Sequence, residues 1–531
     1  MREVRTRIAY IFVLALVLAA LWAWWRYVLD FPFAWWADNW ARVLVDWVTL
    51  EPLPPEAALT PRHMASLYAA GGAIAFLWFA LWVFGRRVTP EEHLSKAEAE
   101  AAAVGRPLPL PNKKQRKRLA ASSARNGDKT LLGRGYSQNC FLTDAMANRG
   151  TLAMGTTGSG KTVTVLNIIE SFIAAGHPVI YVDGKGDRPL GEQIVNYAAA
   201  RGVDTHLFAM TPDKFKKTSA YNPLASGTPT QLKDRIIAYG EWSEAHYKKL
   251  AEGYLQIVFT VLHDCRISVG MTELDGYMTR DRLTAEVRSA VQKGGLPEGR
   301  GTELLNKIAS HAEGEKHSAG LRADIANLAE SDISHLLGAK GFNIAEALAG
   351  GKTVYFGLSP AQYSKVAPAL GRLIVNDLKA ATMIDRRTTL LVFDEFSVFP
   401  GDQILHILNQ GRSFGLCTVL TVQSLSDIGR TLGSEAEAFT RQVLGNCNNF
   451  LIHRLNTPDD ADYTAKLIGT YGTIDWTTKV GKHGNAKASS ARQIHKLAVH
   501  PDKIKRLRDG QAVFYQKPET TSEINVRKSR I

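Results

Sequence analysis

Two long uncharged stretches mark the beginning of the chain. Residues 8–25 and 64–84 contain no Asp, Glu, Lys or Arg and are rich in Leu, Ala, Val and Trp. Because a helix needs about 20 apolar residues to cross a bilayer, the pattern predicts two transmembrane helices. Arginines precede the first stretch and follow the second, so both flanks are expected on the cytoplasmic side. Region 1–87 is therefore predicted to be a transmembrane region with a periplasmic loop between its spans.

From about residue 131 the pattern changes to short apolar runs separated by helical periodicity. Such runs are typical of buried strands in a parallel sheet that is covered on both faces. They predict an α/β domain over residues 131–227 and 346–531. Between these parts, residues 228–345 show long amphipathic patterns and few strand signals, which predicts an all-α insertion domain. The predicted strands are 177–183, 205–209, 354–358, 389–395, 417–423 and 449–453.

Positive charge is concentrated in one short stretch of the chain. The 531 residues carry a net charge of +13, which suits an anionic partner such as nucleic acid or a lipid surface. Residues 86–134 hold twelve Lys or Arg against five Asp or Glu, including the basic run 113–118. We expect a basic linker over residues 88–130, and the run is interpreted as a solvated segment, an anionic-lipid site or a nucleic-acid contact. A later basic stretch, 479–496, is interpreted as a surface loop or as part of a DNA path.

Cysteines and histidines give no indication of a metal centre. The four cysteines show no C-x-x-C spacing, and the fourteen histidines form no H-E-x-x-H pair. We therefore expect no zinc site and interpret the cysteines as reduced thiols.

One octapeptide carries the most specific chemical signal. Residues 155–162 read GTTGSGKT and fit G-x-x-x-x-G-K-[ST], the phosphate-binding loop of nucleoside-triphosphate hydrolases. In this motif backbone N–H groups surround phosphate, the lysine reaches the β- and γ-phosphates, and the hydroxyl after it holds Mg²⁺. An apolar run precedes the motif and a helical pattern follows it, as the motif requires. The predicted ATP-binding residues are Gly155, Thr156, Thr157, Gly158, Ser159, Gly160, Lys161 and Thr162, with Thr162 also on Mg²⁺.

A second acidic motif closes a later predicted strand. Asp394 and Glu395 follow four apolar residues. Asp394 is predicted to hold Mg²⁺, directly or through water, as part of the nucleotide site. Glu395 is predicted to polarise the attacking water as general base. An Asp-Glu pair is weak evidence alone, but it becomes specific in combination with the phosphate loop.

Further motifs follow the phosphate loop in a fixed order. They are VDGKGD at 182–187, YNPL at 221–224, FDEF at 393–396, QGRSFG at 410–415 and VQS at 422–424. With them the chain, from residue 1 to about 520, resembles the coupling ATPases of conjugation and type IV secretion, the TraD/TraG group. The resemblance implies a RecA-like P-loop motor domain that forms a homo-hexamer on the bacterial inner membrane, with most of the chain in the cytoplasm. It also implies that the helical insertion receives the substrate.

The resemblance also assigns roles to single residues. Arg412 matches an arginine finger that reaches the γ-phosphate of the neighbouring subunit, and Gln423 resembles a γ-phosphate sensor. The catalytic set is then Lys161, Glu395, Arg412 and Gln423. Arg454 is a weaker candidate for the nucleotide site.

The function that follows is an ATPase of the inner membrane that recruits a relaxase-bound single-stranded DNA. It would bring this relaxosome substrate to the components of a type IV secretion channel and drive its transfer. Two alternatives keep the motor but change the cargo: a double-stranded DNA translocase of the FtsK/HerA kind, which YNPL argues against, and a coupling protein for protein effectors. A third is a membrane docking platform with nucleotide as a structural clamp. Glu395 and Arg412 argue against the clamp, which needs neither base nor finger.

Overall fold

The computed structural model describes residue 72 and residues 108–531, except residues 214–216, 243, 384–385, 399–400, 430–431, 481–485 and 519. Apart from Gly72, both expected membrane spans lie outside these described residues. Of the helices that are described, none combines the length and the apolar character needed to cross a membrane. The chain divides into two compact units, residues 1–101 with 478–489 and residues 102–477 with 490–531. The elements described below belong mainly to the second unit.

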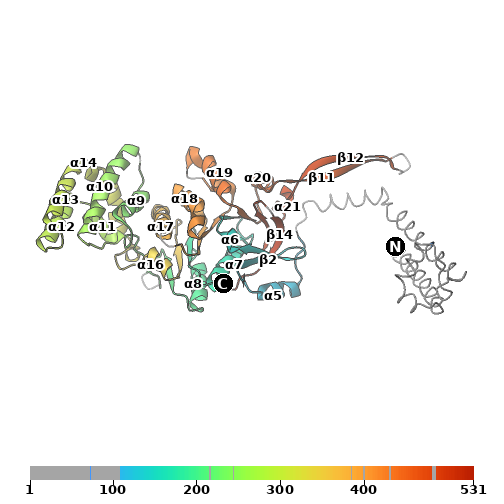
Figure 1. The fold of residues 1–531 in the computed structure, drawn as a ribbon, viewed down its shortest axis with the longest axis horizontal. Coiled ribbons are helices and arrows are strands. Elements are labelled where there is room, and N and C mark those ends of the chain that lie inside the picture. The colour runs from blue at the N-terminus through green and yellow to red at the C-terminus, as the bar shows by residue number, and fades with distance from the viewer. Residues whose placement is uncertain are drawn as a thin grey trace, which may run out of the picture. The chain divides into compact units, whose positions relative to one another are not determined.

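A parallel sheet forms the centre of this unit (Figure 1). Its seven strands run in the order β10-β4-β9-β8-β5-β7-β6, and each neighbouring pair is parallel. The α/β sheet predicted from the apolar runs is confirmed, and all six predicted strands are present. The bounds are β4 (Thr151–Met154), β5 (Val179–Asp183), β6 (Thr205–Ala209), β7 (Thr353–Gly357), β8 (Thr389–Asp394), β9 (Leu416–Val422) and β10 (Asn449–Ile452).

An antiparallel extension, which the sequence did not predict, continues the sheet beyond β10. β10 pairs with β13 in antiparallel register, and β14, β2 and β1 follow, with β3 attached to β2. β1 has only two residues and β14 begins with four polar residues, so neither carries the apolar run that marks the parallel strands. Their bounds are β1 (Arg125–Asn126), β2 (Lys129–Arg134), β3 (Asn139–Thr143), β13 (Gln511–Gln516) and β14 (Thr520–Val526).

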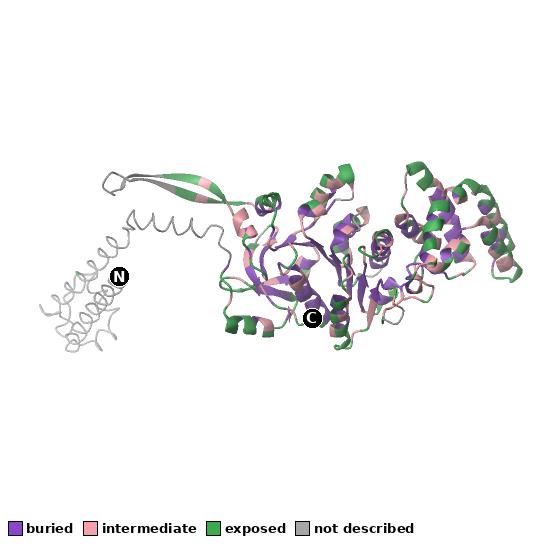
Figure 2. Ribbon diagram, turned by 180° about the vertical axis from the view of Figure 1, so that it is seen from behind, coloured by how far each residue is buried: buried purple, intermediate pink, exposed green. Residues whose placement is uncertain are grey.

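Helices cover both faces of the sheet and create two hydrophobic cores. Side chains alternate between the faces of a strand, so Ile180 joins one core and Tyr181 the other. α7 (Lys161–Ala174) and α8 (Arg188–Ala199) contribute to the core of Tyr181. The opposite core receives α17 (Val366–Thr382), α18 (Asp402–Gln410), α19 (Ala436–Asn446) and α20 (Pro458–Ile468). Figure 2 shows the buried residues concentrated in the strands and on the helix sides that face them.

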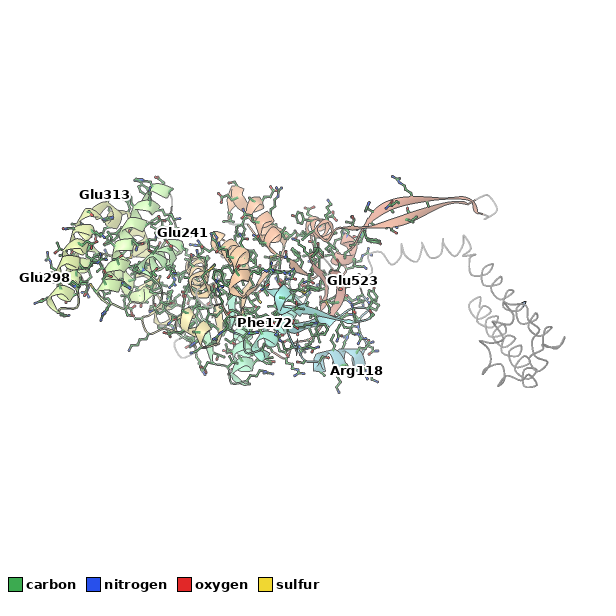
Figure 3. All side chains as sticks on the ribbon, viewed as in Figure 1. Arg118, Phe172, Glu241, Glu298, Glu313 and Glu523 are labelled. Carbon is green, nitrogen blue, oxygen red and sulfur yellow. The ribbon has the colours of Figure 1, made fainter. Side chains whose placement is uncertain are left out.

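In the described part of residues 229–349, the regular elements are all helices. Figure 1 shows α10 to α14 grouped together, away from the sheet. Figure 3 labels Glu298 and Glu313 on this group and Phe172 on α7 beside the sheet. The bounds are α9 (Pro229–Tyr239), α10 (Ala245–Asp264), α11 (Met271–Tyr277), α12 (Arg280–Gln292), α13 (Glu298–Ser310), α14 (Ala312–His317), α15 (Ala319–Ala329), η1 (Ser334–Leu336) and α16 (Ile344–Ala349).

A buried group of polar residues connects these helices to the sheet part; we call Tyr221, Arg235 and Asp377 the junction cluster. Arg235 in α9 pairs with Asp377 in α17, with 2.9 Å between its Nη2 and Oδ1, and the two side chains are 2% and 0% exposed. The Tyr221 hydroxyl donates to Asp377 Oδ2 at 2.6 Å. Arg235 also donates to the carbonyl oxygens of Pro223 and Ser226. The YNPL motif is therefore located at the joint between the two parts.

The basic run 113–118 lies on a helix, α5 (Lys113–Ala121), within the stretch expected to be a linker. Asn112 caps its N-terminus, and Leu119 is buried against the domain. Arg527, itself fully buried, donates to the carbonyl oxygen of Ser122 and pairs with Glu170 of α7 at 2.8 Å. The end of this stretch is thus docked, while basic side chains such as Arg118 stay exposed (Figure 3). The apolar contact of one leucine in a basic run was too weak a signal for the sequence to predict docking.

The basic stretch 479–496 is largely part of a hairpin. β11 (Thr470–Val480) and β12 (Ala486–Leu497) form a two-stranded sheet of their own. Side chains described on it are mostly exposed, including Tyr471 and Ile474. The remaining short elements are α6 (Asp144–Ala147), η2 (Phe396–Val398), η3 (Gly411–Phe414), η4 (Leu425–Asp427), η5 (Gly433–Glu435) and α21 (Pro501–Lys505).

Candidate functional site

The predicted nucleotide-binding residues meet at one edge of the parallel sheet. The phosphate loop follows β4, the Asp394–Glu395 pair closes β8, and Gln423 follows β9. β4, β9 and β8 are consecutive neighbours in the sheet, so their carboxyl ends lie side by side. Ligands of open α/β sheets bind at this edge.

The backbone of the phosphate loop has a shape that requires glycine. Gly158 and Gly160 have φ of +79° and +100°, in the region that L-residues rarely adopt. A Cβ on Gly160 would lie 2.8 Å from the Gly510 nitrogen, and one on Gly155 would lie 2.5 Å from His453 Cβ. Gly160 is also the N-cap of α7 and forms no side-chain cap. The first turn of α7 thus presents N–H groups without a capping side chain, which fits an anion such as phosphate.

Lys161 is the first residue of α7 and is almost completely buried. Its Nζ donates to the Val422 carbonyl oxygen at 2.9 Å, and the residue is 5% exposed. Burial lowers the pKa of Lys161, while the carboxylates of Asp394 and Glu395 raise it. Burial is the larger effect, so the pKa of Lys161 lies below its ordinary value. Thr162, half-buried, follows it in the same turn.

Asp394 is held in place by two hydroxyl groups. The Tyr181 hydroxyl donates to Oδ2 at 2.8 Å, and the Thr421 hydroxyl donates to Oδ1. Within the described ranges, no group of three or more His, Cys, Asp or Glu is placed to hold a metal ion by itself. Mg²⁺ in nucleotide sites takes one or two protein ligands together with phosphate oxygens. Thr162 and Asp394 fit that role.

Glu395 belongs to a group that we call the Glu395 cluster, with Lys185 and Gln423. Its backbone has φ of +52°, which is unusual for a residue other than glycine. Lys185 Nζ lies 3.0 Å from Glu395 Oε2, and Gln423 Nε2 donates to the same oxygen at 3.0 Å. Gln423 Oε1 accepts a hydrogen bond from the Thr157 hydroxyl at 3.3 Å. Gln423 thus joins the phosphate loop to Glu395.

Arg412 does not lie at this site within its own chain. It is exposed in η3, before β9 begins, whereas Gln423 follows the end of β9. The seven residues of β9 separate the two edges by roughly 20 Å. Arg454 follows β10; its carbonyl oxygen accepts the Thr156 N–H at 3.0 Å, and its guanidinium pairs with Asp509. Its backbone, rather than its charge, touches the phosphate loop.

Residues that sequence reasoning gave no site role also shape this edge. Lys185 belongs to the VDGKGD motif, but its contact with Glu395 is visible only in the structure. His453 is fully buried behind the loop, contacts Thr164 Oγ1 at 3.1 Å, and burial lowers its pKa to about 4. Gly510 donates its N–H to the Ser159 carbonyl oxygen at 3.0 Å. No sequence signal identified His453 or Gly510, because both are separated from the loop by about 300 residues or more.

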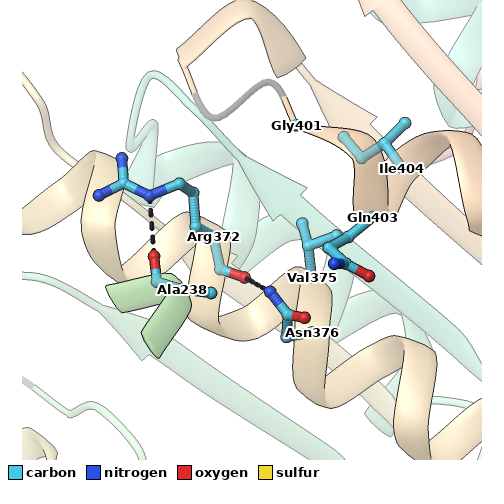
Figure 4. Close-up of a pocket in the computed structure, with 7 residues that line it drawn as sticks. All are labelled: Ala238, Arg372, Val375, Asn376, Gly401, Gln403 and Ile404. Atoms are coloured by element: carbon cyan, nitrogen blue, oxygen red, sulfur yellow. Dashed lines mark hydrogen bonds between the residues drawn. The ribbon is translucent and has the colours of Figure 1, made fainter. Parts of the chain in front are cut away.

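A separate hollow lies between α9, α17 and α18 (Figure 4). Arg372 and Asn376 line it, and Arg372 donates to the Ala238 carbonyl oxygen at 2.9 Å. None of the predicted site residues lines this hollow.

Two family models match parts of the chain. The model for the TraM recognition site of TraD and TraG matches residues 388–509, and the helicase HerA-like C-terminal model matches residues 129–200. The type 4 coupling protein DotL of Legionella pneumophila is 27% identical over 108 residues, 18% of this chain and 14% of DotL. Part of the chain is thus similar to the TraD/TraG-type coupling proteins, although it covers only a small share of DotL. An uncharacterised protein of Mycoplasma pneumoniae is 30% identical over 128 residues, 23% of this chain and 83% of that protein.

Solved structures show that this chain has an α/β P-loop ATPase-like fold. The conjugative coupling protein TrwBΔN70 has a TM-score of 0.53 and 14% identity, with 80% of this chain and 94% of that chain covered. TrwB in complex with the non-hydrolysable ATP analogue ADPNP has a TM-score of 0.50 and 15% identity, with 80% and 94% covered. At this identity the likeness concerns the fold.

Proposed function

We propose that this chain is an inner-membrane coupling ATPase that recruits a relaxase-bound single-stranded DNA to a type IV secretion or conjugation channel and drives its transfer. One observation carries the proposal: the phosphate loop, the Asp394–Glu395 pair and Gln423 converge at one sheet edge. The TraM-recognition match over residues 388–509 and the partial likeness to DotL support the coupling role. TrwB binds ADPNP on the same fold, which supports ATP as the nucleotide.

In this proposal the site residues divide the chemistry. The loop N–H groups and Lys161 bind the phosphates, and Thr162 and Asp394 hold Mg²⁺, which supplies positive charge to the phosphate oxygens when bound. Glu395 accepts a proton from the attacking water. Gln423, which bridges the loop and Glu395, acts as the γ-phosphate sensor.

Arg412 has its role in a neighbouring subunit. Its exposure, and its position at the sheet edge opposite to the phosphate loop, are compatible with an arginine finger that completes the next site of a homo-hexamer. Such a finger stabilises the charge of the transition state in trans.

A second candidate keeps the motor and changes the cargo. The HerA-like match over residues 129–200 favours a DNA translocase that acts on double strands. Transfer of a marked plasmid in cells with and without the gene distinguishes the two, because only the coupling protein is required for transfer.

Hydrolysis by the purified full-length chain tests the site. We expect phosphate release that single-stranded DNA stimulates, and a loss of about 10²–10³-fold in Lys161→Ala and Glu395→Gln. Lys293→Ala, at an exposed position on the helical part, is the matched control and retains the wild-type rate. Undiminished hydrolysis by a folded Lys161→Ala protein would reject the assignment.

A further inference from the structure

Lys185 is a charged residue at the nucleotide edge that takes no part in the proposed hydrolysis. Its Nζ and the Nε2 of Gln423 both lie 3.0 Å from Glu395 Oε2. The oxygen of the proposed base is thus engaged by two donors, one of which carries a full positive charge. A carboxylate oxygen held in this way is less accessible to a water molecule, because the two donors occupy positions that the water would take.

The loop that carries Lys185 is fixed to the turn that carries Glu395. Asp183, fully buried, accepts the N–H groups of Lys185 and Asp187 at 2.7 and 2.8 Å. Gly184 donates its N–H to the Asp394 carbonyl oxygen at 2.8 Å, and a Cβ on Gly184 would lie 2.7 Å from the Glu395 carbonyl oxygen. The backbone is therefore rigidly placed, and the mobile part is the four-carbon side chain of Lys185.

The two lysines of this edge differ in their surroundings. Lys161 is buried and bonded to a main-chain oxygen, whereas the Lys185 side chain is 42% exposed. Burial lowers the pKa of Lys185, but the carboxylates of Asp394 and Glu395 raise it by more. The side chain therefore remains an ammonium at neutral pH. Apart from burial, the pKa of Lys161 is influenced mainly by the charges of Asp394, Glu395 and Lys185. These four charged groups are therefore close enough to interact with one another.

We propose that Lys185 is a positioning residue that distinguishes nucleoside triphosphate from diphosphate by exchanging Glu395 for the terminal phosphate. Without nucleotide, its ammonium is held by Glu395. A terminal phosphate bound beside Lys161 brings more negative charge than one carboxylate, attracts the ammonium and leaves Glu395 free to act as base. A diphosphate leaves the pair intact. This inference rests on the proposed ATPase function.

Equilibrium binding tests the exchange without any need for turnover. Calorimetry on the purified full-length chain would compare affinities for ADPNP and ADP, both with Mg²⁺. Lys185→Met keeps the aliphatic stem and removes the charge; we expect ADPNP affinity to fall about tenfold and ADP affinity to change less than twofold. Lys185→Arg restores the preference for ADPNP. Lys293→Met, on the exposed helical part, is the matched control and binds like the wild type.

A double-mutant cycle with Glu395→Gln distinguishes two possibilities. In the first, Lys185 leaves Glu395 for the phosphate; in the second, Lys185 attracts the phosphate independently of Glu395. Neutralising Glu395 releases Lys185, so ADPNP affinity is expected to rise, and this rise should shrink clearly in the Lys185→Met background. A rise of equal size in both backgrounds would overturn the exchange, as would an equal loss of ADP and ADPNP affinity in Lys185→Met. If the wild type binds neither nucleotide, the proposed function fails as well; if it binds both normally and Lys185→Met is unchanged, only this inference fails.

Discussion

The junction cluster and the Glu395 cluster use the same chemistry at two different levels of burial. Each joins a carboxylate to a cation and to one neutral donor. At the junction, the Arg235 and Asp377 side chains are 2% and 0% exposed; at the nucleotide edge, Lys185 is 42% exposed. Since a buried charge without an oppositely charged partner costs several kcal/mol, separating Arg235 from Asp377 is expected to be strongly unfavourable. The buried junction cluster is therefore expected to keep its partners, whereas in the Glu395 cluster the exposed lysine can change partner.

The largest expected effect is the loss of a junction partner. Asp377→Ala leaves the Arg235 charge buried and unpaired, and we expect it to lower the free energy of unfolding by about 3–5 kcal/mol. Glu395→Ala leaves a Lys185 side chain that is 42% exposed and can be hydrated, so we expect it to cost about 1 kcal/mol or less while abolishing hydrolysis. Urea unfolding of both variants measures the difference. Equal losses of stability would mean that burial does not distinguish the clusters.

The next largest expected effect is that the free energy of unfolding depends on pH through the junction cluster. Burial raises the pKa of Asp377 to about 6, against the attraction of Arg235 and the hydrogen bond from Tyr221. Because the folded pKa is raised, this group's stabilising contribution is full below the unfolded value of about 3.8 and is lost as pH rises through about 6. Relative to Asp377→Asn, the wild type should therefore lose up to about 3 kcal/mol of unfolding free energy between pH 4 and pH 7. A difference that stays constant over this range in urea titrations would contradict the raised pKa.

A smaller effect distinguishes two glycines within the phosphate loop. Gly158→Ala meets open space and is expected to cost about 1 kcal/mol through its positive φ alone. Gly160→Ala adds a clash with the Gly510 nitrogen, so its cost should exceed that of Gly158→Ala. Thermal unfolding without nucleotide compares the two. If Gly158→Ala proved the more damaging, the contact between Gly160 and Gly510 would not support the loop.

The smallest effect is expected for Lys185. The Lys185 side chain is 42% exposed and Glu395 11%, so water screens the lysine and the pair is expected to contribute about 0–1 kcal/mol to stability. Lys185→Met should therefore unfold within about 1 kcal/mol of the wild type, as measured in urea. A loss as large as that of Asp377→Ala would show that Lys185 has a structural role instead.

The parallel sheet could be predicted because its strands are buried on both faces and form long apolar runs. β14, by contrast, reads TTSEINV and begins with four polar residues, so the local pattern did not mark it as a strand. In the site, the phosphate loop and the Asp394–Glu395 pair are encoded by local spacing. The partner of Lys185 lies about 210 residues away, and only the order of strands in the sheet brings the two together.

The support of the phosphate loop by Gly510 has a consequence for how the protein is made. The loop is synthesised about 350 residues before the glycine against which Gly160 rests. At 5–20 residues per second, the ribosome reaches Gly510 on the order of 20–70 s after it has passed the loop. During that interval the nascent chain lacks the backbone against which its phosphate loop rests, so the loop acquires this support only after Gly510 has been synthesised.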